Sequence, residues 1–201
     1  TQFSESVPKK VEEALQELRE KEVEGLILDL RNNSGGLVSS GIAVADSLLS
    51  EKPVVETKNR NGIKDAIISQ KETSFDGPMV TLVNKGTASA SEILAGSLQD
   101  NYRSILMGEK TYGKGLIQSL KSLGEDSGIA ITVASYLTPK GNNIQGQGMT
   151  PDKLLDLPDA SEYGSADDKW VRNAELYLES LLENEELAFQ TSELSNEEIK
   201  P

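Results

Sequence analysis

The sequence predicts an α/β domain built in layers, with a partly parallel sheet. Two continuous apolar runs, GLILDL (25–30) and MVTLVN (79–84), are typical of strands that are buried on both faces. Each run is followed by a polar loop and then by a stretch in which apolar residues recur at helical spacing. Strands that alternate with helices favour this architecture, since a helix can return the chain to pair the next strand in parallel.

The first helix is expected at 7–21, where apolar residues such as Val11 and Leu15 share one face. Ser6 stands where a capping residue is needed, and Pro8 falls in the first turn, where its missing N–H is harmless. Further helices are expected at 37–49, 90–101 and 165–183.

The remaining strands are expected at shorter patterned stretches. Two of them, 53–58 and 63–69, flank Asn61-Gly62, which is a strong hairpin signal. Further strands are expected at 104–109, 116–120 and 128–138, followed by a glycine-rich loop at 139–152.

The C-terminal segment is expected to form a separate appendage. Ser165 and Asp168 resemble a capping box at the start of its helix. After Glu183 the sequence becomes acidic and weakly patterned, which predicts a loosely attached tail. The division is therefore a core domain at 1–160 and a C-terminal helix with an acidic tail at 161–201.

Composition excludes several functions. The 201 residues carry a formal net charge of -13, which argues against nucleic acid and against an anionic membrane surface as partners. No apolar stretch is long enough to insert into a membrane. The chain has no histidine and no cysteine, so cysteine-protease and Ser-His-Asp chemistry, disulfides and the usual zinc sites are ruled out. We expect no cofactor.

The stretch NKGTASASE (84–92) places a serine where a strand turns into a helix. Backbone N–H groups and the positive end of the helix dipole favour negative charge there. Ser89 and Glu92 also match an ordinary capping box, which would explain Ser89 without catalysis and would leave Ser91 without a role.

The stretch GEKTYGKG (108–115) nearly matches a phosphate-binding loop. Gly115 replaces the hydroxyl residue that would hold Mg²⁺, and LIQSL does not resemble the helix that must follow. Taken alone, Lys114 reads as a solvated loop lysine. Its flanking glycines and the apolar Leu116 and Ile117 nevertheless favour a tight, partly buried setting.

The stretch DLRNNSGG (29–36) has two glycines after a strand, so its backbone N–H groups can face a ligand. Taken alone, it is only a flexible turn. Together, the three stretches supply a serine, a lysine and a backbone oxyanion site, the parts of a Ser-Lys acyl-transfer site. An ordinary lysine is protonated at neutral pH, but burial disfavours its charged form and makes it a base.

These three motifs together resemble the carboxyl-terminal processing proteases, also called tail-specific proteases or peptidase family S41. The resemblance runs from about residue 1 to residue 152 and is nearest to the branch that trims the photosystem II D1 precursor. It implies a crotonase/ClpP-like layered core of ββα units.

The resemblance also implies roles for individual residues. Ser89 would be the nucleophile rather than Ser91. Lys114 would be the general base, oriented by Gln118. The oxyanion would be held by the backbone N–H groups of Gly35, with Gly36 as an alternative, and of Ala90, while Glu92 would support the start of the helix.

The partner implied is a protein or peptide with a free C-terminus, and the location implied is the periplasm or the thylakoid lumen. Such proteases usually carry a PDZ domain ahead of this core, and no stretch of this chain resembles one. We therefore expect this chain by itself to be weakly active or inactive, and its oligomeric state stays open. Two other readings stay open, namely a non-catalytic peptide- or ligand-binding module of the same fold, and a nucleotide-binding protein that uses GEKTYGKG.

Overall fold

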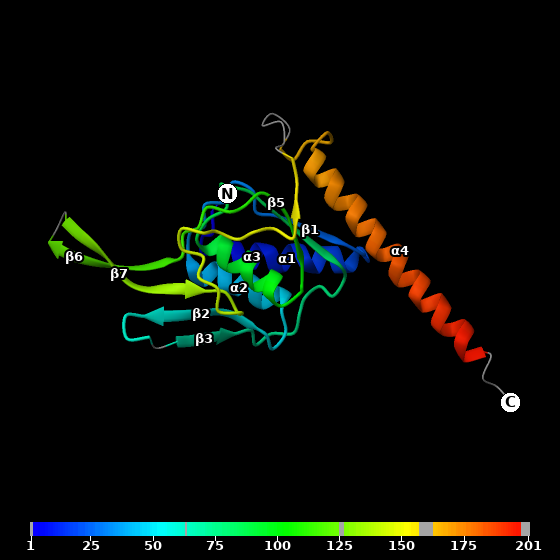
Figure 1. Ribbon diagram of the computed structural model, residues 1–201, viewed down its shortest axis with the longest axis horizontal. Coiled ribbons are helices and arrows are strands. Elements are labelled where there is room, and N and C mark those ends of the chain that lie inside the picture. Colours follow the sequence, from blue (N-terminus) through cyan, green and yellow to red (C-terminus); the bar gives the residue numbers. More distant parts are fainter. Residues whose placement is uncertain (1, 63, 125–126, 157–162, 198–201) are drawn as a thin grey trace.

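The computed structural model describes residues 2–62, 64–124, 127–156 and 163–197. Its elements form four layers, which can be followed in Figure 1. The C-terminal helix covers one face of a parallel sheet, three helices pack on the other face, and an antiparallel sheet closes that second core. The mixed α/β class expected from the sequence is confirmed.

The parallel sheet has the strand order β1-β4-β5-β8. Its strands are β1 (Leu26–Asp29), β4 (Met79–Val83), β5 (Ile105–Gly108) and β8 (Lys153–Leu154). Every residue of β4 is buried, as its apolar run predicts. β1 is different, because it lies at the edge of the sheet and its apolar side chains are only half-buried. β8 is a two-residue strand that the sequence did not indicate.

Three helices fill the space between the two sheets: α1 (Val7–Glu20), α2 (Val38–Leu48) and α3 (Ala90–Asp100). Each lies within two residues of its expected bounds. The expected cap of α1 is wrong, because Ser6 stands at the cap position but its side chain makes no capping hydrogen bond.

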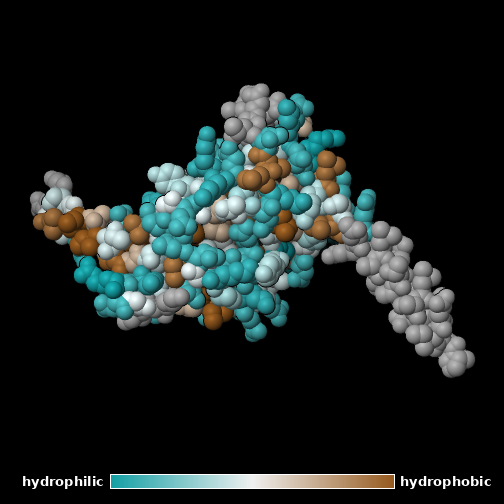
Figure 2. All heavy atoms as spheres, in the orientation of Figure 1, coloured by the Kyte–Doolittle hydropathy of each residue, from teal (hydrophilic) through white to brown (hydrophobic). Residues whose placement is uncertain are grey.

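The antiparallel sheet has the order β3-β2-β7-β6. Its strands are β2 (Pro53–Asn59), β3 (Lys64–Ile68), β6 (Leu116–Gly124) and β7 (Ser127–Leu137). The expected hairpin of β2 and β3 is confirmed. The β6–β7 hairpin is longer than expected and projects from the body at the left of Figure 1. Alternate apolar side chains of β7 are therefore exposed, and brown atoms gather on the projecting hairpin at the left of Figure 2.

The C-terminal helix α4 (Lys169–Glu197) begins four residues later than expected and continues past Glu183, where the sequence suggested a loose tail. Its first turns bury Trp170, Ala174 and Leu178 against the parallel sheet. Its second half extends away from the sheets in Figure 1. The expected domain boundary at residue 160 lies outside the described residues. No helix in the described part of the chain is long and apolar enough to cross a membrane.

Candidate active site

Ser89 occupies the sharp turn between β4 and α3, and its backbone is strained. Its φ of 57° and ψ of -119° lie in a region that is unfavourable for any residue with a Cβ atom. An ordinary N-cap residue has extended dihedral angles, so a cap alone does not explain this conformation. A serine held on a strained strand-to-helix turn is the arrangement that presents the nucleophile in α/β-hydrolases. Ser89 is half-buried, so its hydroxyl is within reach of a substrate.

Ser91, the other candidate, is inaccessible. The residue has no exposed surface, and its hydroxyl oxygen is buried without a hydrogen-bond partner in the described chain. A substrate cannot reach this oxygen unless the helix moves. Accessibility therefore favours Ser89 over Ser91, the choice that the sequence resemblance implies.

Glu92 ties the Ser89 turn to the 111–115 loop. Its side chain is fully buried, and its two carboxylate oxygens accept four hydrogen bonds. Oε2 accepts from the amides of Ser89 at 2.9 Å and Lys114 at 2.8 Å. Oε1 accepts from the amide of Gly113 at 2.7 Å and from Thr111 Oγ1 at 2.5 Å. The residue thus does more than support the start of α3: it fixes the backbones of the expected nucleophile and the expected base to one carboxylate.

The backbone of Lys114 contacts this carboxylate, but Lys114 and Gln118 are both exposed residues. The partly buried setting expected for Lys114 is not found, because the described residues leave Lys114 exposed. Gln118 is the third residue of β6, directly after an irregularity in the β6–β7 register at Ile117 and Gln118. Lys114 precedes the strand, so the regular alternation of a strand does not fix the two side chains on one face.

The backbone of the 111–115 loop rules out the phosphate-binding reading of GEKTYGKG. Each amide from residue 111 to residue 115 donates to a protein acceptor, namely the carbonyl oxygens of Met149 and Thr87 and the side chains of Glu92 and Gln145. The loop then enters β6 rather than a helix. A phosphate would find neither free amides nor a helix N-terminus there.

The backbone amides expected to hold the oxyanion differ in whether they already donate a hydrogen bond within the described chain. Ala90 is the first residue of α3, so its amide has no partner within the helix, and no hydrogen bond joins it to another described residue. The amide of Gly35 donates to Asn33 Oδ1 at 3.1 Å. Gly36 is exposed, and its amide makes no hydrogen bond among the residues described. The Gly35 amide would have to leave Asn33 before it could serve an oxyanion.

Gly35 itself lies directly against the Ser89 turn. A Cβ atom added at Gly35 would lie 2.8 Å from Ser89 Cβ and 3.0 Å from the Ala90 nitrogen. Its φ of +96° also favours glycine. The structure thus brings Gly35, Ser89 and Ala90 together, as the sequence resemblance implies.

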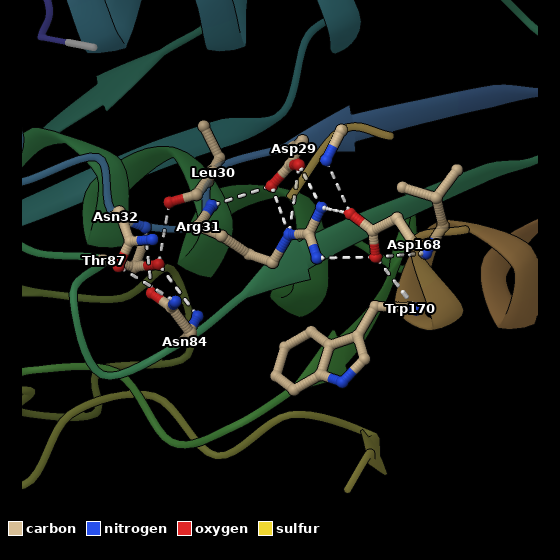
Figure 3. Close-up of polar contacts among 10 residues, drawn as sticks. Asp29, Leu30, Arg31, Asn32, Asn84, Thr87, Asp168 and Trp170 are labelled. Atoms are coloured by element: carbon tan, nitrogen blue, oxygen red, sulfur yellow. Dashed lines mark hydrogen bonds and ion pairs between the residues drawn. The ribbon is translucent and has the colours of Figure 1, made fainter. Parts of the chain in front are cut away.

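The 31–36 loop is fastened to the 84–88 turn on one side by the polar contacts that Figure 3 draws. The amide of Asn32 donates to Asn84 Oδ1 at 2.9 Å, and Asn84 Nδ2 donates back to Asn32 Oδ1 at 3.1 Å. Thr87 Oγ1 donates to the carbonyl of Leu30 at 2.8 Å. The loop therefore cannot shift without breaking bonds to the turn that carries Ser89.

On its other side the loop is held by Arg31, whose side chain is 1% exposed (Figure 3). The guanidinium donates to both oxygens of Asp29, with distances of 2.9 Å from Nε and 2.6 Å from Nη2. It also donates to both oxygens of Asp168, at 3.0 Å from Nη1 and 2.6 Å from Nη2. Asp168 in turn accepts from the amides of Trp170 and Val171 and so caps α4. The expected box with Ser165 is replaced by this cap.

Acid should weaken this contact. Burial alone would raise the pKa of Asp168, but hydrogen bonds from Arg31 and from the backbone amides of Gly164 and Val171 outweigh it and lower the pKa from 3.8 to about 2. A carboxylate whose folded pKa is depressed stabilises the fold above its unfolded pKa and loses that contribution as the pH falls through the folded pKa. We therefore expect the free energy of unfolding to fall between about pH 4 and pH 2 partly through Asp168.

Urea unfolding at pH 5, 3.5 and 2.5 measures this effect. The fall in the free energy of unfolding should be shallower in Asp168→Asn than in Asp167→Asn, a matched change at an exposed neighbour. Equal slopes in the two variants would show that Asp168 does not titrate as described.

Sequence reasoning missed Arg31, Asn33, Asn84, Thr111 and Asp168 as parts of this site. A weak signal existed for Asn84, since Asn-Lys-Gly after a strand is typical of a side-chain-bonded turn. Nothing local links Arg31 to Asp168, which lies 137 residues away.

Comparisons with known proteins show the family of the chain. The model of "Peptidase family S41" matches residues 1–155. A carboxyl-terminal-processing protease of Synechocystis is 51% identical over 158 residues, which are 79% of this chain and 37% of that protein. A chloroplastic C-terminal processing peptidase of Tetradesmus obliquus is 46% identical over 77% of this chain and 33% of that protein.

The structure of a photosystem II D1 C-terminal processing protease superposes with a TM-score of 0.74 at 43% identity, over 77% of this chain and 40% of that one. The chain thus spans little more than a third of the length of the curated relatives it matches.

Proposed function

Because the chain belongs to peptidase family S41, we propose that it is the catalytic core of a serine endopeptidase that cleaves proteins near their C-termini. The observation that carries the proposal is the strained backbone of Ser89 beside the amide of Ala90, which makes no hydrogen bond to any residue that the structure describes. Strain in a non-glycine residue persists only where the surroundings impose it, and here they place a hydroxyl next to a free N–H donor.

In the proposed reaction, neutral Lys114 takes the Ser89 proton as Oγ attacks the scissile carbonyl. The amides of Ala90 and Gly35, or Gly36 in its place, hold the oxyanion, and each such donor contributes about 3 kcal/mol to transition-state stabilisation. Lys114 then protonates the leaving amine, and water releases the acyl group from Ser89. Gln118 orients Lys114.

The exposure of Lys114 bears on when this chemistry can occur. Lys114 is exposed, so in the proposed reaction a bound substrate or a covering segment would exclude water from it. This agrees with the proposal that residues 1–201 alone are weakly active, and that a PDZ domain in a longer protein supplies substrate capture. The similarity to a photosystem II D1 C-terminal processing protease supports a D1-type precursor as the substrate. We also propose a location in the thylakoid lumen or the periplasm, and the chloroplastic relative supports the first of these.

Cleavage of a protein substrate with a free C-terminus tests the proposal in the full-length protein. Ser89→Ala and Lys114→Ala should each lower the rate of cleavage by 1000-fold or more, by the general magnitude of removing a nucleophile or its base. The control variants are Ser91→Ala and Lys110→Ala, which change the nearest serine to Ser89 and the nearest lysine to Lys114 in this part of the sequence. Both variants should cleave the substrate at the wild-type rate. Substrate binding without any cleavage in the wild type would favour the non-catalytic binding module instead.

A further inference from the structure

Helix α4 lies outside the part of the chain that the family model matches, which ends at residue 155. The cap of α4 nevertheless contacts the 31–36 loop, which lies beside Ser89. Asp168, directly before the first residue of α4, makes a two-pronged contact with the Arg31 guanidinium, and both side chains are 1% exposed. Arg31 opens the 31–36 loop, so the cap of α4 and the expected oxyanion loop share one buried ion pair.

This ion pair restrains the loop strongly because Arg31 has no other anion to replace Asp168. Its only other carboxylate partner among the described residues is Asp29, which occupies Nε and one hydrogen-bonding position of Nη2. Without Asp168, Nη1 and the rest of Nη2 would be left unpaired in a buried site, which is unfavourable for a charged group. The guanidinium would have to turn toward solvent, and the backbone of residue 31 would have to follow.

A shift at residue 31 would reach the amides next to Ser89. Asn32 has a positive φ of 56°, and its amide donates to Asn84. The short segment from Asn32 to Gly35 therefore has little freedom to absorb a movement at residue 31. Asn33 accepts a hydrogen bond from the Ala88 amide and its side chain holds the Gly35 amide. The position of the loop therefore decides how close the glycine amides lie to Ser89.

We propose that Asp168 is a positioning residue that acts through Arg31 to hold the 31–36 loop against the Ser89 turn, so that the Gly35 amide has only to turn away from Asn33 to complete the oxyanion site. The inference rests on the proposed peptidase function. It assigns α4 a task in the reaction as well as in packing.

The expected kinetic effect is selective. Oxyanion donors act on the transition state more than on the bound substrate, so Asp168→Asn should lower kcat at least 10-fold while KM changes less than threefold. Asp167→Asn, the same charge change at an exposed position one residue away, should leave both constants unchanged. Asp168→Glu, which keeps the carboxylate, should recover part of the lost kcat.

Loss of α4 packing must be separated from loss of the ion pair. Leu178→Ala weakens the docking of α4 on the parallel sheet but does not touch Arg31. At temperatures well below both unfolding transitions, Leu178→Ala should keep a kcat within threefold of the wild type. An equal loss of kcat in Leu178→Ala and Asp168→Asn would overturn the positioning role and leave only a packing role.

Amide hydrogen exchange of the full-length protein supplies a readout that does not depend on activity. Exchange in the peptide that covers 31–36 should become at least 10-fold faster in Asp168→Asn than in Asp167→Asn. Unchanged exchange there would overturn the inference even if the protein proves to be a peptidase. A wild type that cleaves nothing, with fast exchange in Asp168→Asn, would instead refute the proposed reaction, and the catalytic role of Asp168 with it.

Discussion

Replacing Ser89 with glycine should abolish proteolysis and at the same time make the protein more stable. The backbone of Ser89, with a φ of 57° and a ψ of -119°, is unfavourable for serine and open to glycine. Strain of this kind costs about 1–3 kcal/mol. Part of the relief is offset, because glycine loses more backbone entropy on folding. We expect a net gain of about 1 kcal/mol in the free energy of unfolding, measured by urea denaturation.

Two comparison variants make this result specific. Ser89→Ala removes the hydroxyl but keeps the strained Cβ, so it should be inactive without any gain in stability. Ser91→Ala removes a buried hydroxyl that has no partner, so it should be active and at least as stable as the wild type. A Ser89→Gly variant that is less stable than the wild type would indicate an ordinary cap at this position.

Replacing Glu92 with glutamine should disrupt both stability and activity. A carboxylate accepts all four hydrogen bonds observed here, whereas an amide has only one oxygen and turns an NH₂ group toward two of the four donors. Each buried donor left unsatisfied costs about 1–3 kcal/mol, so we expect a loss of about 3 kcal/mol or more. Activity should fall at least 100-fold, because the Ser89 and Lys114 backbones lose their common acceptor.

Thermal and urea unfolding together with cleavage assays measure this loss. Glu109→Gln is the matched control. Glu109 directly follows β5 and makes no contact with the Ser89 turn among the described hydrogen bonds, so this variant should resemble the wild type. Thr111→Val removes one donor to Glu92 and should show an intermediate loss of stability. If Glu92→Gln unfolded like Glu109→Gln, Glu92 would not be the link between the two segments.

Most elements could be predicted from the sequence because their signals are local. The apolar run of β4, the Asn61-Gly62 turn and the helical spacing in α3 each depend on neighbouring residues only. The half-burial of β1 could not be predicted, because a strand's place at the edge of a sheet depends on which strands pair. β8 was missed because a two-residue strand carries no period.

The site divides in the same way. Ser89, Ala90, Glu92 and Lys114 belong to short motifs, so the sequence located them, although it could not show that Glu92 joins the two motifs. The buried contact of Arg31 with Asp168 spans 137 residues and has no local trace. The sequence left the exposure of Lys114 undecided, because a loop lysine is usually solvated while its flanking glycines and apolar neighbours favoured burial. Gly113 and Gly115 are buried, but Lys114 between them is exposed.

The rate at which an acylating, serine-directed probe modifies the full-length protein tests the pairing of Ser89 with Lys114 most directly. Peptide mass mapping should place the label on Ser89, because the attacking hydroxyl is activated by a base beside it. The label should be lost in Lys114→Ala and kept in Lys110→Ala. Labelling of Ser89 at the same rate in Lys114→Ala, or a label on Ser91, would contradict the account.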